Sequence, residues 1–246
     1  EIRSCDWSSD VCSSDLETDA ARFFEAMAIR IVPGERAQFI AGDNRAGYYE
    51  GWTHGHGGGV GYRIGELSLF KDRASFLDGQ RLPRDAARSE TLYPYGHCVE
   101  HANARDCLLL HAGRTALSLR IESNNAAELA LMPLWSAALS GYRIEKLDGA
   151  VLLAPPAPTP EDGHPDWIAL SADAPLRIEV SPSAQGDAVS MYLHRTMPGR
   201  RLTLHIAYGD SREEAIASAR ALAAQDSWQQ QVELQHQRLS RASLIT

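Results

Sequence analysis

Apolar and polar residues alternate with a period of two along much of this chain, which is the pattern of β-strands with one buried face. The clearest run is 115–121 (TALSLRI), and 201–208 (RLTLHIAY) repeats the pattern near the C-terminal end. Asp78 and Gly79, between two short strand-like segments, are typical of a hairpin turn. The pattern therefore predicts a mainly β fold, a large antiparallel β-sandwich of the supersandwich type built from many short strands.

Two prolines bear on how these strands are connected. Pro133 lies inside the predicted strand 129–135 (LALMPLW), which indicates an edge strand or a bulge. The stretch 154–165 (APPAPTPEDGHP) holds five of the 12 prolines and could be a domain linker or a long loop. We favour a loop, because strand-like segments resume at once at 166–170 and neither flank could close a two-sheet core alone.

After residue 210 the period changes from two to that of a helix. Ser211 and Glu214 form a capping box, with Ser at the N-cap and Glu three positions later. An apolar stripe follows at helical spacing, and Trp228 and Val232 continue it four residues apart. We therefore predict a sandwich over 17–210 and a C-terminal helical linker over 211–246, with helix to about Leu239.

The first 16 residues do not resemble an evolved sequence. Residues 6–16 (DWSSDVCSSDL) resemble the translation of a common sequencing-library adapter. We therefore interpret 1–16 as an artefactual, disordered tail, exclude it from the fold and expect the natural N-terminus to lie elsewhere.

Length and charge narrow the functional classes. The chain has 246 residues, of which 44% are hydrophobic and 23% charged, which is close to the globular average. The net charge of −8 argues against a nucleic-acid partner, because such proteins present a Lys/Arg-rich surface. Apolar runs stay well short of the roughly 20 residues that span a membrane. We therefore expect neither nucleic acid nor a membrane as a partner.

Cysteine usage suggests a compartment. Outside the tail only Cys98 and Cys107 remain, too few for a disulfide scaffold. A reducing, cytoplasmic location is therefore the expectation.

The segment 43–70 (DNRAGYYEGWTHGHGGGVGYRIGELSLF) concentrates the residues that could contact a ligand. Its aromatic rings could stack on the C–H face of a sugar, and its polar groups could bond hydroxyls. Packing of the same rings into the sandwich core is an equally weighted alternative. The residues that we expect to bind an oligosaccharide are Tyr48, Tyr49, Trp52, His54 and His56.

Other kinds of site find less support in the sequence. A zinc site from His54, His56, His97 and His101, with Cys98 or Glu66, is conceivable, but the spacing matches no known ligand pattern. The run GHGGGVG lacks the Lys of a phosphate-binding loop. Glycoside hydrolysis needs two flanking carboxylates, and spacing alone selects no pair among Glu50, Glu66 and Glu100. We therefore expect no cofactor, no metal and no complete catalytic site.

Three segments together resemble a known family: DNRAGYYEGW with GELSLF, RTALSLRIESNNAAELALMPLW, and the C-terminal LTLHIAYGDSREEAIASARALAAQDSWQQQVELQHQRLSRASLIT. They are similar to the region before the catalytic barrel of α/α-toroid glycosidases. These include bacterial glycogen-debranching-type amylo-α-1,6-glucosidases and trehalase-like, processing-glucosidase-like and glucoamylase-like enzymes. The resemblance covers most of residues 17–246.

The resemblance implies a non-catalytic N-terminal sandwich domain, inactive alone, whose partner would be an (α/α)6 barrel carrying the catalytic carboxylates. It further implies substrates of the α-glucan or α-glucosidic oligosaccharide type, with residues 48–59 as a loop near the barrel mouth.

A stand-alone carbohydrate-binding module is the alternative function, and a small His-rich metalloprotein ranks third. The alternatives differ in a structural expectation. A module should fold a polar C-terminal helix back on the sandwich, whereas an accessory domain should leave the face of Trp228 and Val232 uncovered.

Overall fold

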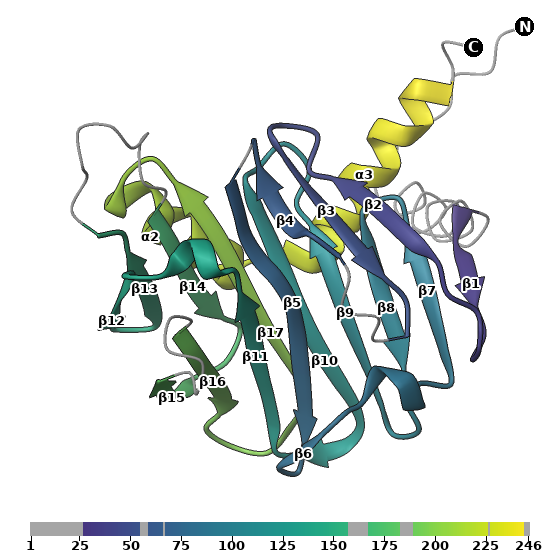
Figure 1. Ribbon diagram of the computed structural model, residues 1–246, viewed down its shortest axis with the longest axis horizontal. Coiled ribbons are helices and arrows are strands. Elements are labelled where there is room, and N and C mark those ends of the chain that lie inside the picture. Colours follow the sequence, from purple (N-terminus) through teal and green to yellow (C-terminus); the bar gives the residue numbers. More distant parts are fainter. Residues whose placement is uncertain are drawn as a thin grey trace, which may run out of the picture.

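The computed structural model describes residues 27–54, 59–65, 67–156, 167–182, 189–225 and 227–243. Within them, two antiparallel sheets lie face to face (Figure 1), which confirms the predicted mainly β sandwich with helix at its C-terminal end. The described helices do not include one that is long and apolar enough to cross a membrane.

The first sheet has nine described strands. In spatial order they are β1 (Ile29–Ile31), β7 (Ser89–Tyr93), β8 (Gly96–Glu100), β9 (Ala104–Leu110), β10 (Ala116–Ala127), β17 (Gly199–Gly209), β14 (Trp167–Ala172), β13 (Ala150–Ala154) and β12 (Arg143–Leu147).

The second sheet has eight described strands. Its order is β15 (Leu176–Pro182), β16 (Val189–Arg195), β11 (Leu129–Trp135), β5 (Leu67–Leu77), β4 (Gly61–Ile64), β3 (Gly47–Trp52) and β2 (Gln38–Gly42), with β6 (Gln80–Arg81) paired to β5. Two short 3-10 helices, η1 (Arg84–Ala86) and η2 (Ala137–Leu139), lie in the connections.

Period-two alternation places one face of each strand in the core between the sheets. On β10, Leu117, Leu119 and Ile121 are fully buried in this core, whereas Ala116 points to the opposite face and packs under a helix. The apolar half of the alternation therefore forms the sandwich interior, as the sequence predicts.

Several local predictions are confirmed. Asp78 and Gly79 both have positive φ, 50° and 73°, and connect β5 to β6. Pro133 precedes a register shift between Leu134 and Trp135, so the predicted irregularity is a bulge. The strands β13 and β14, which flank the proline-rich stretch, pair in one sheet, and residues 157–166 between them lie outside the described residues.

The C-terminal helical segment is divided in two. The predicted cap is confirmed, because the Ser211 side chain accepts a hydrogen bond from the Glu214 backbone N–H at the start of α2 (Arg212–Ala224). The helix does not continue unbroken to Leu239: Gln225 is extended, with φ −104° and ψ 146°, and α3 (Ser227–Ser243) begins after it. Both helices lie on the outer side of the nine-stranded sheet, and α3 extends past the sandwich at its end (Figure 1).

A buried ion pair connects the two sheets. Arg73 on β5 donates through Nε to Asp106 Oδ1 on β9 over 2.9 Å, and both side chains are almost fully buried. His101 Nε2 lies 3.3 Å from the other carboxylate oxygen. The pair therefore fixes how β5 lies against β9 in the interior between the sheets.

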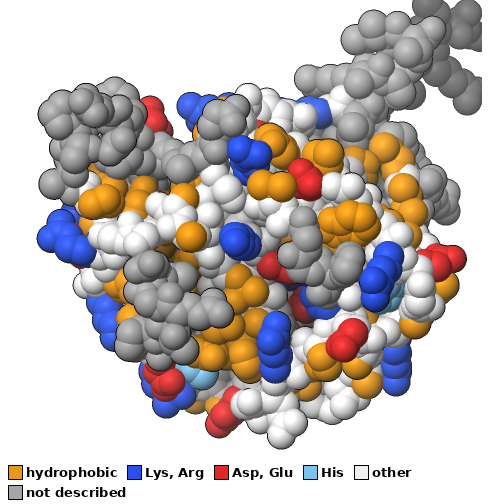
Figure 2. Space-filling model, in the orientation of Figure 1, with side chains coloured by type: hydrophobic (Ala, Val, Ile, Leu, Met, Phe, Trp, Pro, Cys, Tyr) orange, Lys and Arg blue, Asp and Glu red, His pale blue; other side chains and the backbone are white. Residues whose placement is uncertain are grey.

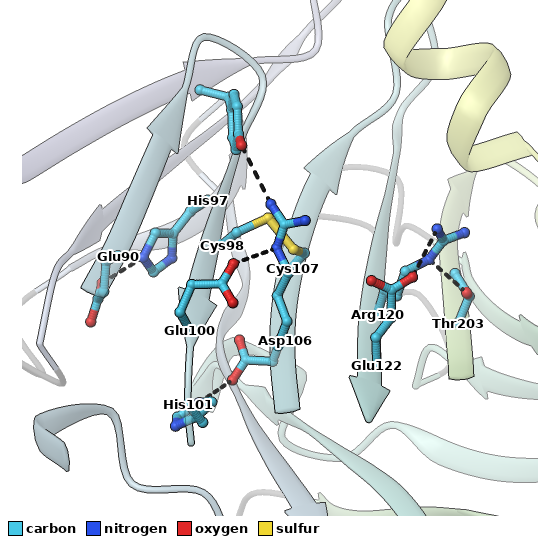
Figure 3. The surroundings of a disulfide bond; sticks show 12 residues. Glu90, His97, Cys98, Glu100, His101, Asp106, Cys107, Arg120, Glu122 and Thr203 are labelled. Carbon is cyan, nitrogen blue, oxygen red and sulfur yellow. Dashed lines mark hydrogen bonds and ion pairs between the residues drawn. A yellow bond between two sulfur atoms is a disulfide. The ribbon is translucent and has the colours of Figure 1, made fainter. Parts of the chain in front are cut away.

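The two cysteines of the sandwich are bonded to each other, which the cysteine count did not predict. Cys98 on β8 and Cys107 on β9 form a disulfide (Figure 3). The two residues are direct partners in the antiparallel register, so their side chains project from the same face of the sheet. Cysteine counting missed the bond because it depends on this pairing rather than on the number of cysteines.

Breaking the inter-sheet ion pair should destabilise the protein more than breaking a surface pair. Arg73→Met leaves the Asp106 carboxylate buried without its cation, so we expect a loss of about 3–5 kcal/mol in the free energy of unfolding. Arg177→Met is the matched control, since Arg177 and Glu179 form an exposed pair and the change should cost less than about 1 kcal/mol. Equal losses for the two variants in urea titrations would contradict the assignment.

Removing the disulfide should also lower stability. Cys98 and Cys107 are nine positions apart, and closing so short a loop restricts the unfolded chain by about 2–3 kcal/mol. We expect the Cys98→Ser/Cys107→Ser double variant to lose that amount in chemical denaturation. Dithiothreitol should destabilise the wild type to a similar degree and leave the double variant unaffected. No response of the wild type to the reductant would show that the bond does not stabilise the fold.

Candidate functional site

The aromatic residues of the glycine-rich segment divide between the two faces of β3. Tyr48 and Trp52 are half-buried on the outer face of the eight-stranded sheet, whereas Tyr49 is 1% exposed and lies in the core. Tyr49 packs beside Phe39, with ring centroids 5.7 Å apart. The structure therefore leaves Tyr48 and Trp52 where a sugar could reach them but places the Tyr49 ring inside the sandwich.

The outer face that carries Tyr48 and Trp52 is not covered by α2 or α3. Figure 2 shows the side of the molecule on which the eight-stranded sheet lies, with hydrophobic side chains interspersed among charged ones. Glu50, between the two aromatic residues on this face, accepts a hydrogen bond from Gln38 over 2.6 Å. The binding of an oligosaccharide at Tyr48 and Trp52 stays a prediction.

Asp43 organises the start of the segment from a fully buried position. Its carboxylate accepts the backbone N–H groups of Arg45, Ala46 and Gly47 and the hydroxyl of Tyr62 over 2.7 Å. A Cβ on Gly47 would lie 2.6 Å from this carboxylate, so only glycine fits there. Burial and the neighbouring Asp43 raise the pKa of Tyr62 far above its ordinary value. Asp43 therefore has a structural role.

His54 is held by the other sheet. Its backbone N–H donates to Glu90 Oε1 over 2.6 Å, and its ring Nε2 lies 3.0 Å from the Val32 carbonyl. Its φ of 53° is rare for a residue with a side chain. His54 therefore fastens the chain just after β3 to β7, and its ring has local partners.

Glu90 is the centre of a second buried polar cluster. His97 Nε2 lies 2.5 Å from Glu90 Oε2 (Figure 3), and the Arg84 guanidinium lies 3.6 Å from the same oxygen. Arg84 also donates to Asp72 and to the Trp52 carbonyl. The cluster therefore fixes the end of β3 from both sides.

Burial and charge shift the pKa values of this cluster in opposite directions. Burial lowers the pKa of His97 to about 4, although its bond to Glu90 acts the other way. Burial alone would raise the pKa of Glu90, but the hydrogen bond and charge of His97 and the charge of Arg84 outweigh it and hold it below its usual range. Because Glu90 and His97 are both fully buried, they support the fold and cannot reach a substrate.

At Asp106, as at Glu90, burial and the neighbouring groups act on the pKa in opposite directions. Burial opposes its ionisation, yet the Arg73 guanidinium and the His101 ring hold the pKa of its carboxyl well below the ordinary value. His111 is a separate case on the outer side of the nine-stranded sheet, where burial lowers its pKa to about 3 and the charge of nearby His205 adds to the effect.

The histidines do not converge on a metal within the described residues. His97 faces Glu90, whereas His101 faces Asp106, and the described part of the chain contains no group of three His, Cys, Asp or Glu that could hold an ion. His56 and Glu66 lie outside the described residues.

Sequence reasoning missed Glu90, although a signal was present. In β7 (SETLY), Glu90 and Leu92 lie on the same face by period-two alternation, so a carboxylate occupies an apolar position. A charged residue on the core face of a strand requires a partner from elsewhere. Here the partners come from β8 and η1.

No family model matches the sequence, and no curated protein matches it. Among solved structures, a family GH92 inverting mannosidase from Bacteroides thetaiotaomicron matches 86% of this chain and 32% of its own, at 15% identity and a TM-score of 0.50. A candidate kojibiose phosphorylase from the human microbiome matches 83% of this chain and 30% of its own, at 8% identity and a TM-score of 0.48. The chain thus spans about a third of these structures, and the likeness to the mannosidase shows the fold alone.

Stability should fall as the pH drops below neutrality, because of the buried histidines. The pKa of His97 is about 4 in the folded protein and about 6.5 when unfolded, so the folded state binds fewer protons. The stabilisation is complete above pH 6.5 and declines as the pH falls towards 4. At about 1.4 kcal/mol per pKa unit, the loss from His97 reaches about 3 kcal/mol.

Urea titrations between pH 7.5 and 4.5 test this dependence. His97→Gln should flatten the slope of unfolding free energy against pH, and His111→Gln should flatten it independently. Slopes that are identical in the wild type and in both variants would exclude the buried histidines as the cause.

Proposed function

We propose that this chain is the non-catalytic N-terminal sandwich domain of a carbohydrate-processing enzyme. The observation that carries the proposal is a two-sheet sandwich whose last strand, β17, leads directly into α2 and α3 on one outer face. A similar fold occupies about a third of a mannosidase chain. In the proposed protein, a catalytic (α/α)6 barrel would follow the helices.

The described carboxylates support a non-catalytic role. Glu50 is bonded to Gln38, and Glu100 pairs with Arg105 over 2.8 Å. Glu122 and Asp173 line one open pocket, but Arg120 and Arg201 respectively lie within 3.6 Å of them. Each of these carboxylates thus has a partner in the sandwich, whereas glycoside hydrolysis requires one to protonate the leaving group.

The finer identity follows from the sequence resemblance. We propose an amylo-α-1,6-glucosidase-like parent that acts on α-glucans or α-glucosidic oligosaccharides. The segment 48–59 would lie near the barrel mouth. A cytoplasmic location was the expectation from cysteine count, but the Cys98–Cys107 disulfide favours an oxidising compartment instead.

One observation favours the second candidate, a stand-alone carbohydrate-binding module. The face of α3 is not left uncovered, because Trp228 and Val232 pack against Tyr95 and Leu109. Buried Gln231 and Gln235 add polar contacts to the β9–β10 turn. A polar helix folded back on the sandwich is what that hypothesis predicts, so the experiment must separate the two functions.

Two measurements separate them. We expect the purified chain to release no glucose from maltotriose, panose or a limit dextrin, and we expect the source DNA to continue in frame past Thr246 into a helical repeat. A longer chain expressed from that frame should hydrolyse at least one of these glucans. A stop codon directly after Thr246 would overturn the accessory-domain proposal, and hydrolysis by the chain alone would overturn its non-catalytic role.

A further inference from the structure

A small pocket opens on the outer side of the nine-stranded sheet, where α3 crosses β8 and β9. Its volume is about 220 Å³, and the Cys98–Cys107 disulfide and Gly96 belong to its lining. Tyr93 is the last residue of β7 and Tyr95 lies in the β7–β8 turn, whereas Trp228 and Val232 come from α3. The pocket is therefore built from segments that are far apart in the sequence.

Aromatic rings dominate its apolar walls. Tyr93 and Tyr95 are stacked, with centroids 5.7 Å apart and an interplanar angle of 19°. The Trp228 ring is fixed by Arg120, whose guanidinium carbon lies 4.3 Å from the ring centroid. Rigid aromatic rings of this kind offer flat surfaces to the C–H face of a sugar.

Charged groups surround the aromatic rings and balance one another. Arg105 forms an ion pair with Glu100 and also lies 3.4 Å from the Tyr93 hydroxyl. Across the sheet, Arg120 lies 3.6 Å from Glu122 and donates to Thr203 over 3.0 Å (Figure 3). Each of the two cations that line the pocket is thus paired with a carboxylate, of which Glu122 also belongs to the lining. This pairing favours an uncharged ligand with hydroxyl donors and acceptors over an anion or a cation.

The partly exposed charges can bond such a ligand. The Arg105 and Glu122 side chains are 39% and 40% exposed. A guanidinium has five N–H donors, and in the described structure Arg105 directs Nε to Glu100 and Nη2 to Tyr93. Its remaining nitrogen can donate to a hydroxyl, and the Glu122 carboxylate can accept from one.

The volume of the pocket limits the size of the uncharged ligand. Pockets for drug-sized molecules measure roughly 300–1,000 Å³, so 220 Å³ suits a single ring. We propose that the pocket formed by Tyr93, Tyr95, Trp228 and the Cys98–Cys107 disulfide binds one neutral pyranose ring. The choice of a sugar rests on the carbohydrate-linked function proposed above, but the pocket requires no barrel.

Ligand titration of the full chain tests the pocket. The probes are methyl α-D-glucopyranoside and methyl α-D-mannopyranoside, followed by nitrogen–proton NMR of the tryptophan indoles. Each glycoside has about 13 non-hydrogen atoms. With a low binding free energy per atom, it should bind with a dissociation constant on the order of 1 mM. We expect the indole signal of Trp228, assigned with Trp228→Phe, to shift while that of Trp52 does not.

Matched variants locate the binding. Tyr93→Ala should weaken binding at least tenfold, whereas Tyr93→Phe keeps the ring and should stay within about twofold of the wild type. Tyr48→Ala, on the outer face of the other sheet, should have no effect.

Three results would overturn the proposal that this pocket binds a sugar. They are no shift with either glycoside, a shift at Trp52 alone, or a loss of binding in Tyr48→Ala rather than Tyr93→Ala. None of these results bears on the reading frame or the hydrolysis assay, so the pocket and the accessory-domain proposal can fail separately.

Discussion

The contact between Arg73 and Asp106 sets the arrangement of the two sheets. Leucines in the interior tolerate small shifts, because burial of apolar surface is not directional. A guanidinium and a carboxylate from opposite sheets tolerate little, since an unpaired charge in that interior is costly. With His101 bonded to the same carboxylate, β5 and β9 can meet in essentially one relative position.

The polar cluster of Glu90, His97 and Arg84 extends this constraint to the glycine-rich segment. At the end of β3, Arg84 donates a hydrogen bond to the Trp52 carbonyl, and two residues later the His54 N–H donates to Glu90. At the other end of β3, Asp43 holds the turn and the Tyr62 hydroxyl. Much of what looks like ligand chemistry in 43–70 is therefore used to fasten β3, with Tyr48 and Trp52 left on the outer surface.

The sequence predicts the local features well and the long-range ones poorly. Alternation, the Asp78-Gly79 turn and the Ser211 cap depend on neighbouring residues, so they can be recognised in a linear pattern. The Cys98–Cys107 bond and the partners of Glu90 depend on which strands become neighbours. The Tyr49 ring shows the same limit, because alternation says that Tyr48 and Tyr49 face opposite ways but not which of them faces the core.

The pocket beneath α3 follows from how that helix is attached. Gln231 and Gln235 bond the backbone at Ala112 and Leu110, while Trp228 lies one turn earlier over β8 and β9. Beside Leu109, on which Trp228 packs, several of the strand residues that line the pocket are small: Gly96, whose added Cβ would clash with the Leu108 backbone, and the two half-cystines. A helix held at a fixed height by hydrogen bonds cannot close down on short side chains, so space remains between the tyrosines and the indole. The same attachment keeps Trp228 in place whether or not a further domain follows α3.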